Sequence, residues 1–254
     1  MPAPRQPSLH RIATAQRAVA ILDTLAENGD LGTNELARRV ALPASTVSRQ
    51  LGTLTDAGLV EHDAASGRYR LGIRLVQLAN AVLARLDVRT EARPHLEELV
   101  RITGETATLH VPGEEDAITV DFVPSAHYVQ HVTQLGRPSI GHATSAGKVM
   151  LAFSERTLPT GPLRAFTKRT LTTRAALAAE LEHVRVQGYA EAYEERESGL
   201  NAVAAPVFAA SGALAAILAL QGPSVRFGPD EAHAALPHLL ERARAVSRAL
   251  GWEG

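Results

Sequence analysis

The 254-residue sequence contains no cysteine and no long apolar run. The absence of cysteine excludes disulfides, thiolate zinc sites and cysteine nucleophiles, and makes a reducing cytoplasm the expected location. The apolar stretch at residues 213–220 is far shorter than the roughly 18 to 20 residues that a membrane helix needs, so no membrane partner is expected. No signal peptide is expected either, because the N-terminal residues lack an apolar segment.

Charge is nearly balanced over the whole chain but not along it. The net charge is −1. Residues 1–90 hold 11 arginines and 8 acidic residues, whereas residues 91–254 hold 15 basic and 19 acidic residues. A mildly basic N-terminal part suits a DNA-binding region, and a mildly acidic C-terminal part suits a separate domain.

Local patterns divide the chain into four parts. Residues 1–10 are polar and proline-rich, which predicts a flexible tail. Residues 11–72 carry three helical patterns and then a hairpin pattern, the order of a winged helix-turn-helix. The helical apolar spacing over residues 73–90 predicts a linker helix, and its apolar stripe suits pairing with a second chain. Residues 91–254 mix strands and helices without strict alternation, which predicts an α+β domain around an antiparallel sheet.

Apolar spacing predicts the helices of the front domain. A helix over residues 14–28 is expected to bury one stripe, which comprises Ala15, Ala18, Val19, Leu22, Leu25 and Ala26. A second helix follows Thr33. A third begins near Pro43 and buries Val47, Leu51 and Leu54. Short strands at 59–62 and 68–71 flank a hairpin loop.

The outward face of the third helix is the candidate DNA-reading surface. Its residues are small and polar apart from Arg49, so the helix fits a major groove about 12 Å wide. Arg49 is the main candidate for a base contact, and the hydroxyls near the helix start suit phosphates. Simple exposure to solvent also produces such a face, so the interpretation depends on the order of elements. The candidate DNA-binding residues are Arg17, Ala44, Ser45, Thr46, Ser48, Arg49, Arg68 and Arg70.

The rear domain has strand patterns at 106–111, 117–123, 127–133, 202–208 and 213–221. Helices are predicted at 88–103, 145–153, 173–187 and 228–250. The helix that follows Thr144 begins with small residues, and such a helix start favours an anion. The same residues also suit tight packing of the helix on the sheet. Lys148 suits either assistance to an anion or a structural salt bridge.

The sequence from Arg17 to Gly72 closely resembles the N-terminal domain of the IclR family of bacterial regulators. The shared pattern includes the run from Leu42 to Leu51 and the wing end Tyr69-Arg70-Leu71-Gly72. Two rear segments, 135–148 and 194–207, also resemble signatures of the family's effector domain. The resemblance implies a winged helix-turn-helix, a GAF-like domain that binds a small organic effector, and dimers that pair into tetramers.

The resemblance also implies where the effector lies. Polar groups that bind small keto acids in the family align with Ala192, Ala202, Ala219 and Gln221 here, so an effector larger or more apolar than glyoxylate is expected. Histidines are expected at the rim of the pocket, and no metal site is expected because no three-ligand spacing occurs. The candidate effector-binding residues are His110, His127, His131, Thr144, Ser145, Ala146, Gly147, Ala192, Leu200, Ala202, Ala219 and Gln221.

Three classes of function fit these observations to different degrees. The favoured one is a ligand-responsive repressor that binds a pseudo-palindromic operator of double-stranded DNA as a dimer. A DNA-binding structural protein without a ligand is the first alternative. An enzyme that uses the rear domain is the second, but the sequence has no nucleophile elbow, P-loop or dinucleotide-binding motif. No enzymatic activity and no cofactor are therefore expected.

Overall fold

The computed structural model describes residues 9–83, 87–127, 133–154, 158 and 161–254. The chain forms two compact units, Met1–Arg85 and Leu86–Gly254. The first holds three helices, a hairpin and a further helix, and the second holds a six-stranded sheet with helices packed on it. This is the α+β architecture that the sequence predicts.

The N-terminal unit has the winged helix-turn-helix order. Its elements are α1 (Leu9–Asn28), α2 (Thr33–Arg39), α3 (Ala44–Asp56), β1 (Val60–Asp63), β2 (Arg68–Leu71) and α4 (Arg74–Leu83). The strands β1 and β2 pair antiparallel, with Val60 opposite Leu71. Leu31 bridges to Tyr69 and so attaches the segment between α1 and α2 to the wing. Helix α1 begins at Leu9, inside the stretch that the sequence predicts as a tail.

The core of the N-terminal unit is small and apolar. Ile21 and Leu25 of α1 are buried against Leu36 of α2 and against Val47 and Leu51 of α3. The predicted stripe of α1 is therefore partly wrong, because the buried face is centred on Ile21. At 100° per residue, a position two residues from the centre of the buried face lies on the other side of the helix. Accordingly Val19 is 55% exposed, and Ala15 and Ala26 are exposed as well.

The junction between the wing and α4 is tightly packed. A side chain at Gly72 would meet the carbonyl oxygen of Gly58 at 2.3 Å, so only glycine fits there. The N–H of Gly72 donates to the carbonyl oxygen of Leu59 at 2.9 Å. Arg74 donates through Nη1 to the carbonyl oxygen of Ala57 at 2.6 Å. The start of α4 is thus fixed to the residues that follow α3.

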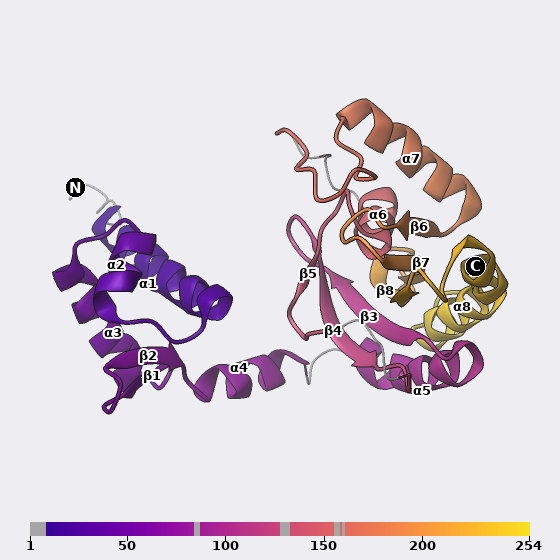
Figure 1. Cartoon of the computed structure of the whole chain (residues 1–254). Helices are drawn as coiled ribbons and strands as arrows, with labels where there is room; N and C mark the ends of the chain where they lie inside the picture. Colours follow the sequence, from indigo (N-terminus) through magenta and orange to yellow (C-terminus); the bar gives the residue numbers. More distant parts are fainter. Residues whose placement is uncertain (1–8, 84–86, 128–132, 155–157, 159–160) are drawn as a thin grey trace, which may run out of the picture. The chain divides into compact units, whose positions relative to one another are not determined.

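The C-terminal unit is built on one antiparallel sheet. The strands follow the order β5 (Pro138–Ser139), β4 (Ala117–Val123), β3 (Thr106–Pro112), β8 (Leu214–Pro223), β7 (Leu200–Phe208) and β6 (Ala190–Tyr193). Helices α6 (Ser145–Phe153) and α7 (Arg174–Gln187) cover one face, and α5 (Asp87–Thr103) and α8 (Pro229–Ala249) cover the other (Figure 1). The sheet is therefore the middle of three layers.

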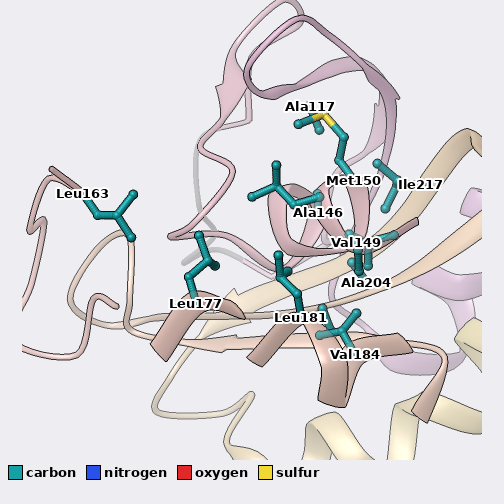
Figure 2. Packing of buried hydrophobic residues seen from close by; sticks show 14 residues of the cluster. Ala117, Ala146, Val149, Met150, Leu163, Leu177, Leu181, Val184, Ala204 and Ile217 are labelled. Atoms are coloured by element: carbon teal, nitrogen blue, oxygen red, sulfur yellow. The ribbon is translucent and has the colours of Figure 1, made fainter. Parts of the chain in front are cut away.

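The face under α6 and α7 holds the apolar cluster shown in Figure 2. Leu177 and Leu181 of α7 point toward α6, whose Val149 and Met150 are fully buried against the sheet. Ile217 of β8 lies on the other side of this cluster. Gly188 ends α7 with φ 82, a left-handed conformation that glycine adopts without strain. This packing fixes α6, and with it the position of the helix start at Thr144.

Two strand assignments differ from the prediction. His127 lies in a bend after β4 rather than in a strand, and residues 128–132 of the expected strand lie outside the described residues. Strands β5 and β6 are not predicted from the sequence, because they are only two and four residues long and too short to show an alternating pattern. The strands at 106–111, 117–123, 202–208 and 213–221 are confirmed as β3, β4, β7 and β8.

Candidate DNA-binding face and effector cavity

Helix α3 separates its core residues from its outward residues as the sequence predicts. Val47, Leu51 and Leu54 are buried, together with Gln50. Ala44, Ser45, Ser48 and Arg49 are exposed, and Thr46 is partly buried. Within the described part of the chain, no residue makes a hydrogen bond or ion pair with the Arg49 guanidinium. The donors of Arg49 are therefore available to an external acceptor.

The wing arginines are engaged within the unit. Arg68 donates through Nη1 to the carbonyl oxygen of Asp30 at 2.7 Å. Arg70 pairs with Glu61 at 3.0 Å, and both side chains are well exposed. Arg17 lies exposed on α1. The structure thus separates an unengaged arginine on α3 from two engaged wing arginines: Arg68 contacts the segment before α2, and Arg70 pairs across the hairpin with Glu61.

In the C-terminal unit a cavity of about 70 Å³ lies beside the sheet at the start of α6. All six strands of the sheet contribute residues to its wall, and the loop between β6 and β7 lines one side. Nine of the predicted effector residues line it: His110, Thr144, Ser145, Ala146, Ala192, Leu200, Ala202, Ala219 and Gln221. Residues distant in sequence therefore meet at one site.

Three predicted effector residues are not among those that line the cavity. His127 is exposed and lies beside Gly104, at the turn between α5 and β3. His131 lies outside the described residues. Gly147 packs backbone to backbone, since an added Cβ would lie 2.3 Å from the Ile140 carbonyl oxygen. For Gly147, tight packing is therefore the reading that the geometry supports.

His110 forms the polar floor of the cavity. Its Nε2 lies 2.8 Å from the Thr108 hydroxyl, and its Nδ1 lies 3.2 Å from the hydroxyls of Thr119 and Ser139. Burial lowers the pKa of His110 to about 4, so the ring is neutral at pH 7. Both ring nitrogens have hydroxyl partners, and the floor is polar without carrying charge.

The remaining predicted positions form an apolar wall and the helix start. Ala192, Ala202 and Ala219 are small side chains. Gln221 donates through Nε2 to the Thr133 hydroxyl at 2.7 Å. The Thr144 hydroxyl accepts from the N–H of Gly147 at 3.0 Å and so caps α6. The first N–H groups of a helix lack intrahelical acceptors, so the α6 start presents donors at this side of the cavity.

Lys148 is a structural ion-pair residue. Its side chain is 2% exposed, and Nζ lies 2.9 Å from Glu180 Oε1 and 2.7 Å from Glu195 Oε1. It also donates to the carbonyl oxygen of Glu191 at 2.9 Å. Burial raises the pKa of Glu195, and the nearby Lys148 opposes that shift. Of the two readings of Lys148, the salt bridge is the one that the structure shows.

Sequence reasoning missed several residues of the cavity wall. The hydroxyl residues Thr108, Thr119 and Ser139 line it, and so do Arg137 and Arg196. The Arg196 guanidinium lies over the Phe166 ring, 4.1 Å from its centroid. Alternation along β3 places Thr108 and His110 on one face, which is a signal that the sequence contains. Nothing local in the sequence indicates that Arg196 reaches the same space.

The described residues include no cluster of three or more histidine, aspartate or glutamate side chains that suits a metal ion. Nor does any helix among them have the length and apolarity required to span a membrane.

A winged helix-turn-helix in one unit and a cavity beside the sheet of the other are features of the class of transcriptional regulators. Two family models match: the IclR helix-turn-helix domain over residues 14–64, and the bacterial transcriptional regulator IclR C-terminal domain over residues 80–248. The chain belongs to the IclR family of transcriptional regulators. The predicted resemblance and the winged helix-turn-helix fold are confirmed.

Individual relatives agree along nearly the whole chain. The HTH-type transcriptional regulator KdgR of Escherichia coli is 31% identical over 246 residues, which cover 95% of this chain and 94% of that protein. The HTH-type transcriptional repressor AllR of Klebsiella pneumoniae is 28% identical over 98% of this chain and 94% of its own length. The crystal structure of Thermotoga maritima IclR matches with a TM-score of 0.72 at 29% identity, over 95% of this chain and all of that one. These relatives are regulators, so the prediction that the chain is not an enzyme is confirmed.

Proposed function

We propose that this regulator is a repressor that binds a pseudo-palindromic operator as a dimer through α3. In this proposal, binding of a small organic effector in the cavity shifts the population toward a state with lower operator affinity. One relative, AllR, is named a repressor. The observation that supports the DNA-reading role most directly is the exposed Arg49, which no described residue engages.

The geometry of α3 supports this assignment of roles. Ser45, Ser48 and Arg49 share the exposed face, while Val47 and Leu51 hold the helix on the core. A guanidinium bonds guanine O6 and N7 with two parallel donors, which small hydroxyl side chains do not match. We therefore assign base reading to Arg49 and phosphate contacts to Ser45, Thr46 and Ser48. Arg17, Arg68 and Arg70 are proposed to contact the DNA backbone.

Operator DNA selected from a random library with the full-length protein provides the test. Arg49→Ala is expected to lose about 1 to 3 kcal/mol of specific binding and to relax the preference at one base pair of each half-site. Arg244→Ala, which removes an exposed arginine of α8, serves as the matched control. If Arg49→Ala bound the selected operator as tightly as the control, Arg49 would have no role in reading it.

We further propose that the effector is larger or more apolar than glyoxylate. At Ala192, Ala202 and Ala219 the cavity wall carries only methyl groups, so these positions offer no polar side chain to a small keto acid and suit an apolar ligand body. Co-purification of the protein from its native host, followed by mass spectrometry, would identify the bound compound. Tight glyoxylate binding by isothermal titration would contradict this part of the proposal.

A further inference from the structure

Strand β4 contains a β-bulge beside the floor of the cavity. Thr119 lies opposite His110 of β3. Asp121 lies opposite Leu109, the preceding residue of β3, so Val120 is an extra residue between the two pairs. Side chains two residues apart on a regular strand share one face of the sheet. The extra residue breaks that alternation and re-aims the side chains beyond it, so Thr119 and Asp121 point to opposite faces.

Thr119 is on the cavity side of the bulge. It is buried and lines the cavity. Its hydroxyl lies 3.2 Å from His110 Nδ1 and donates to the carbonyl oxygen of Arg137 at 3.3 Å. The N–H of Gly136 donates to the Thr119 carbonyl oxygen at 2.8 Å. A group that enters the cavity at its polar floor therefore meets the residue that directly precedes the bulge.

Asp121 is on the other side of the bulge and contacts α5. Its side chain is 7% exposed, and Oδ1 accepts from Arg93 Nη1 at 3.1 Å. Its Oδ2 lies 3.4 Å from Arg89 Nε. Arg93 also donates to the carbonyl oxygen of Phe122 at 3.2 Å. Arg89 and Arg93 are about one helical turn apart, so one buried carboxylate holds the first two turns of α5 on β4.

The part of α5 that Asp121 holds ends at a proline. Pro94 lies inside α5. It has no N–H to donate to the carbonyl oxygen of Thr90, and its ring crowds that oxygen. Residues 87–93 are therefore separated from the rest of the helix by a weakened point in its hydrogen bonding. Because α5 is the first element of the C-terminal unit, this segment is the part of that unit closest along the chain to the DNA-binding unit.

We propose that Asp121 is a coupling residue, which passes a displacement of Thr119 in the cavity through the bulge to the first two turns of α5. The proposal rests on the proposed effector-binding role of the cavity and names the path from the cavity to that helix. Without a ligand, the Asp121 ion pairs hold residues 87–93 on β4. A ligand that displaces Thr119 weakens these pairs and releases the segment. The two states differ in the contacts of one carboxylate, which is the differential interaction that a population shift requires.

Amide hydrogen exchange of the full-length protein tests the α5 side of this path without operator or effector. The readout is the exchange rate of residues 87–93. Asp121→Asn keeps the side-chain shape and removes the charge, and we expect about tenfold faster exchange, because hydrogen bonds to charged groups are lost. Glu98→Gln is the matched control, since Glu98 pairs with Arg101 within α5, and it should leave this segment unchanged. Arg93→Gln repeats the test from an exposed partner, and unchanged exchange in both Asp121→Asn and Arg93→Gln would overturn the proposal.

The cavity side is tested by two matched threonine variants. Thr119→Val and Thr108→Val each remove one hydroxyl partner of His110, but only Thr119 lies on the bulged strand. We expect Thr119→Val to speed exchange of residues 87–93 about two- to tenfold and Thr108→Val to leave it unchanged. In the Asp121→Asn background, Thr119→Val should add nothing. Equal effects of the two threonine variants, or a full additional effect in that background, would show an ion pair that stabilises α5 without coupling it to the cavity.

Operator binding separates the coupling from the proposed repressor function. Asp121→Asn is expected to bind the selected operator at least about fivefold more weakly than the wild type, because release of the α5 segment imitates the liganded state. Glu98→Gln should bind it as the wild type does. Wild-type operator affinity in Asp121→Asn would contradict the coupling. A wild type that binds no operator would contradict the repressor function instead, and the exchange results would then decide the coupling on their own.

Discussion

The candidate base-reading residues lie on one helix, whereas the cavity draws its wall from all six strands of the sheet, a helix start and the loops between them. On α3 the candidate DNA-binding side chains are exposed, unlike the buried Val47 and Leu51. In the cavity the candidate effector-binding side chains include residues of the packed interior, such as the buried His110. The difference teaches that residues of the first site are free to change without loss of stability, while most residues of the second are not.

The largest expected effect comes from removal of the buried cation beside the cavity. Lys148→Met leaves Glu195 buried without its partner, and breaking a buried ion pair costs about 3 to 5 kcal/mol of unfolding free energy. Denaturant unfolding of the full-length protein measures this loss. Lys168→Met, which alters an exposed lysine, should be neutral. A Lys148→Met protein as stable as the wild type would contradict the expectation that residues around the cavity, unlike those on the exposed face of α3, are needed for stability.

The second effect concerns the polar floor. Burial lowers the pKa of His110 in the folded protein to about 4, from an ordinary value of 6.5, so folding favours the neutral ring. The resulting stability is present above pH 6.5 and is lost as the pH falls toward 4, by about 3 kcal/mol in total. The unfolding free energy of His110→Gln is expected to fall less over this range. His183→Gln, which changes an exposed histidine of α7, should follow the wild type, and parallel curves for all three proteins would contradict the prediction.

The third effect distinguishes packing from ligand contact at the start of α6. Gly147→Ala places a methyl group 2.3 Å from the Ile140 carbonyl oxygen, and overpacking of this kind costs about 1 to 3 kcal/mol. Gly161→Ala is the control, because nothing lies within 4 Å of a side chain there. Unfolding curves of both variants provide the measurement. Unchanged stability of Gly147→Ala would contradict the interpretation that Gly147 serves tight packing.

The smallest effect concerns the wing. Arg68→Ala removes the hydrogen bond to the Asp30 carbonyl oxygen, and a typical hydrogen bond contributes about 0.5 to 1.5 kcal/mol. We also expect weaker binding to all DNA and a smaller salt dependence, since Arg68 is a proposed phosphate contact. Binding isotherms at several salt concentrations separate this from Arg49→Ala, which should change sequence preference. A salt dependence equal to that of the wild type would exclude the phosphate contact.

The sequence predicts α3 well because helical periodicity is local. Val47, Leu51 and Leu54 define the buried face within eight residues. It predicts α1 less well, since alanines and a valine on an exposed face look the same as buried ones, and only the partner helices decide that Ile21 is central. The strands β3, β4, β7 and β8 are long enough to be recognised. The short β5 and β6 depend on pairing with neighbours that the local sequence does not reveal.

The cavity illustrates the limit of local patterns more clearly. Family positions led to Ala192, Ala202, Ala219 and Gln221, and these residues do meet in one wall. The partners of Lys148, Glu180 and Glu195, are 32 and 47 residues away along the chain, so only the fold brings them together. Arg196 reaches the cavity through a loop whose shape depends on Thr167 and Thr170. No spacing rule connects these residues.

The glycine at the end of the wing has a mechanical consequence. Gly72 packs directly on the Gly58 carbonyl, and Arg74 donates to the Ala57 carbonyl. The start of α4 therefore contacts the residues that follow α3 without an intervening side chain. We therefore expect a rotation of α4 to move the C-terminal end of α3 with it. A bulkier residue at position 72 would push these two backbones apart and weaken the coupling between α4 and α3.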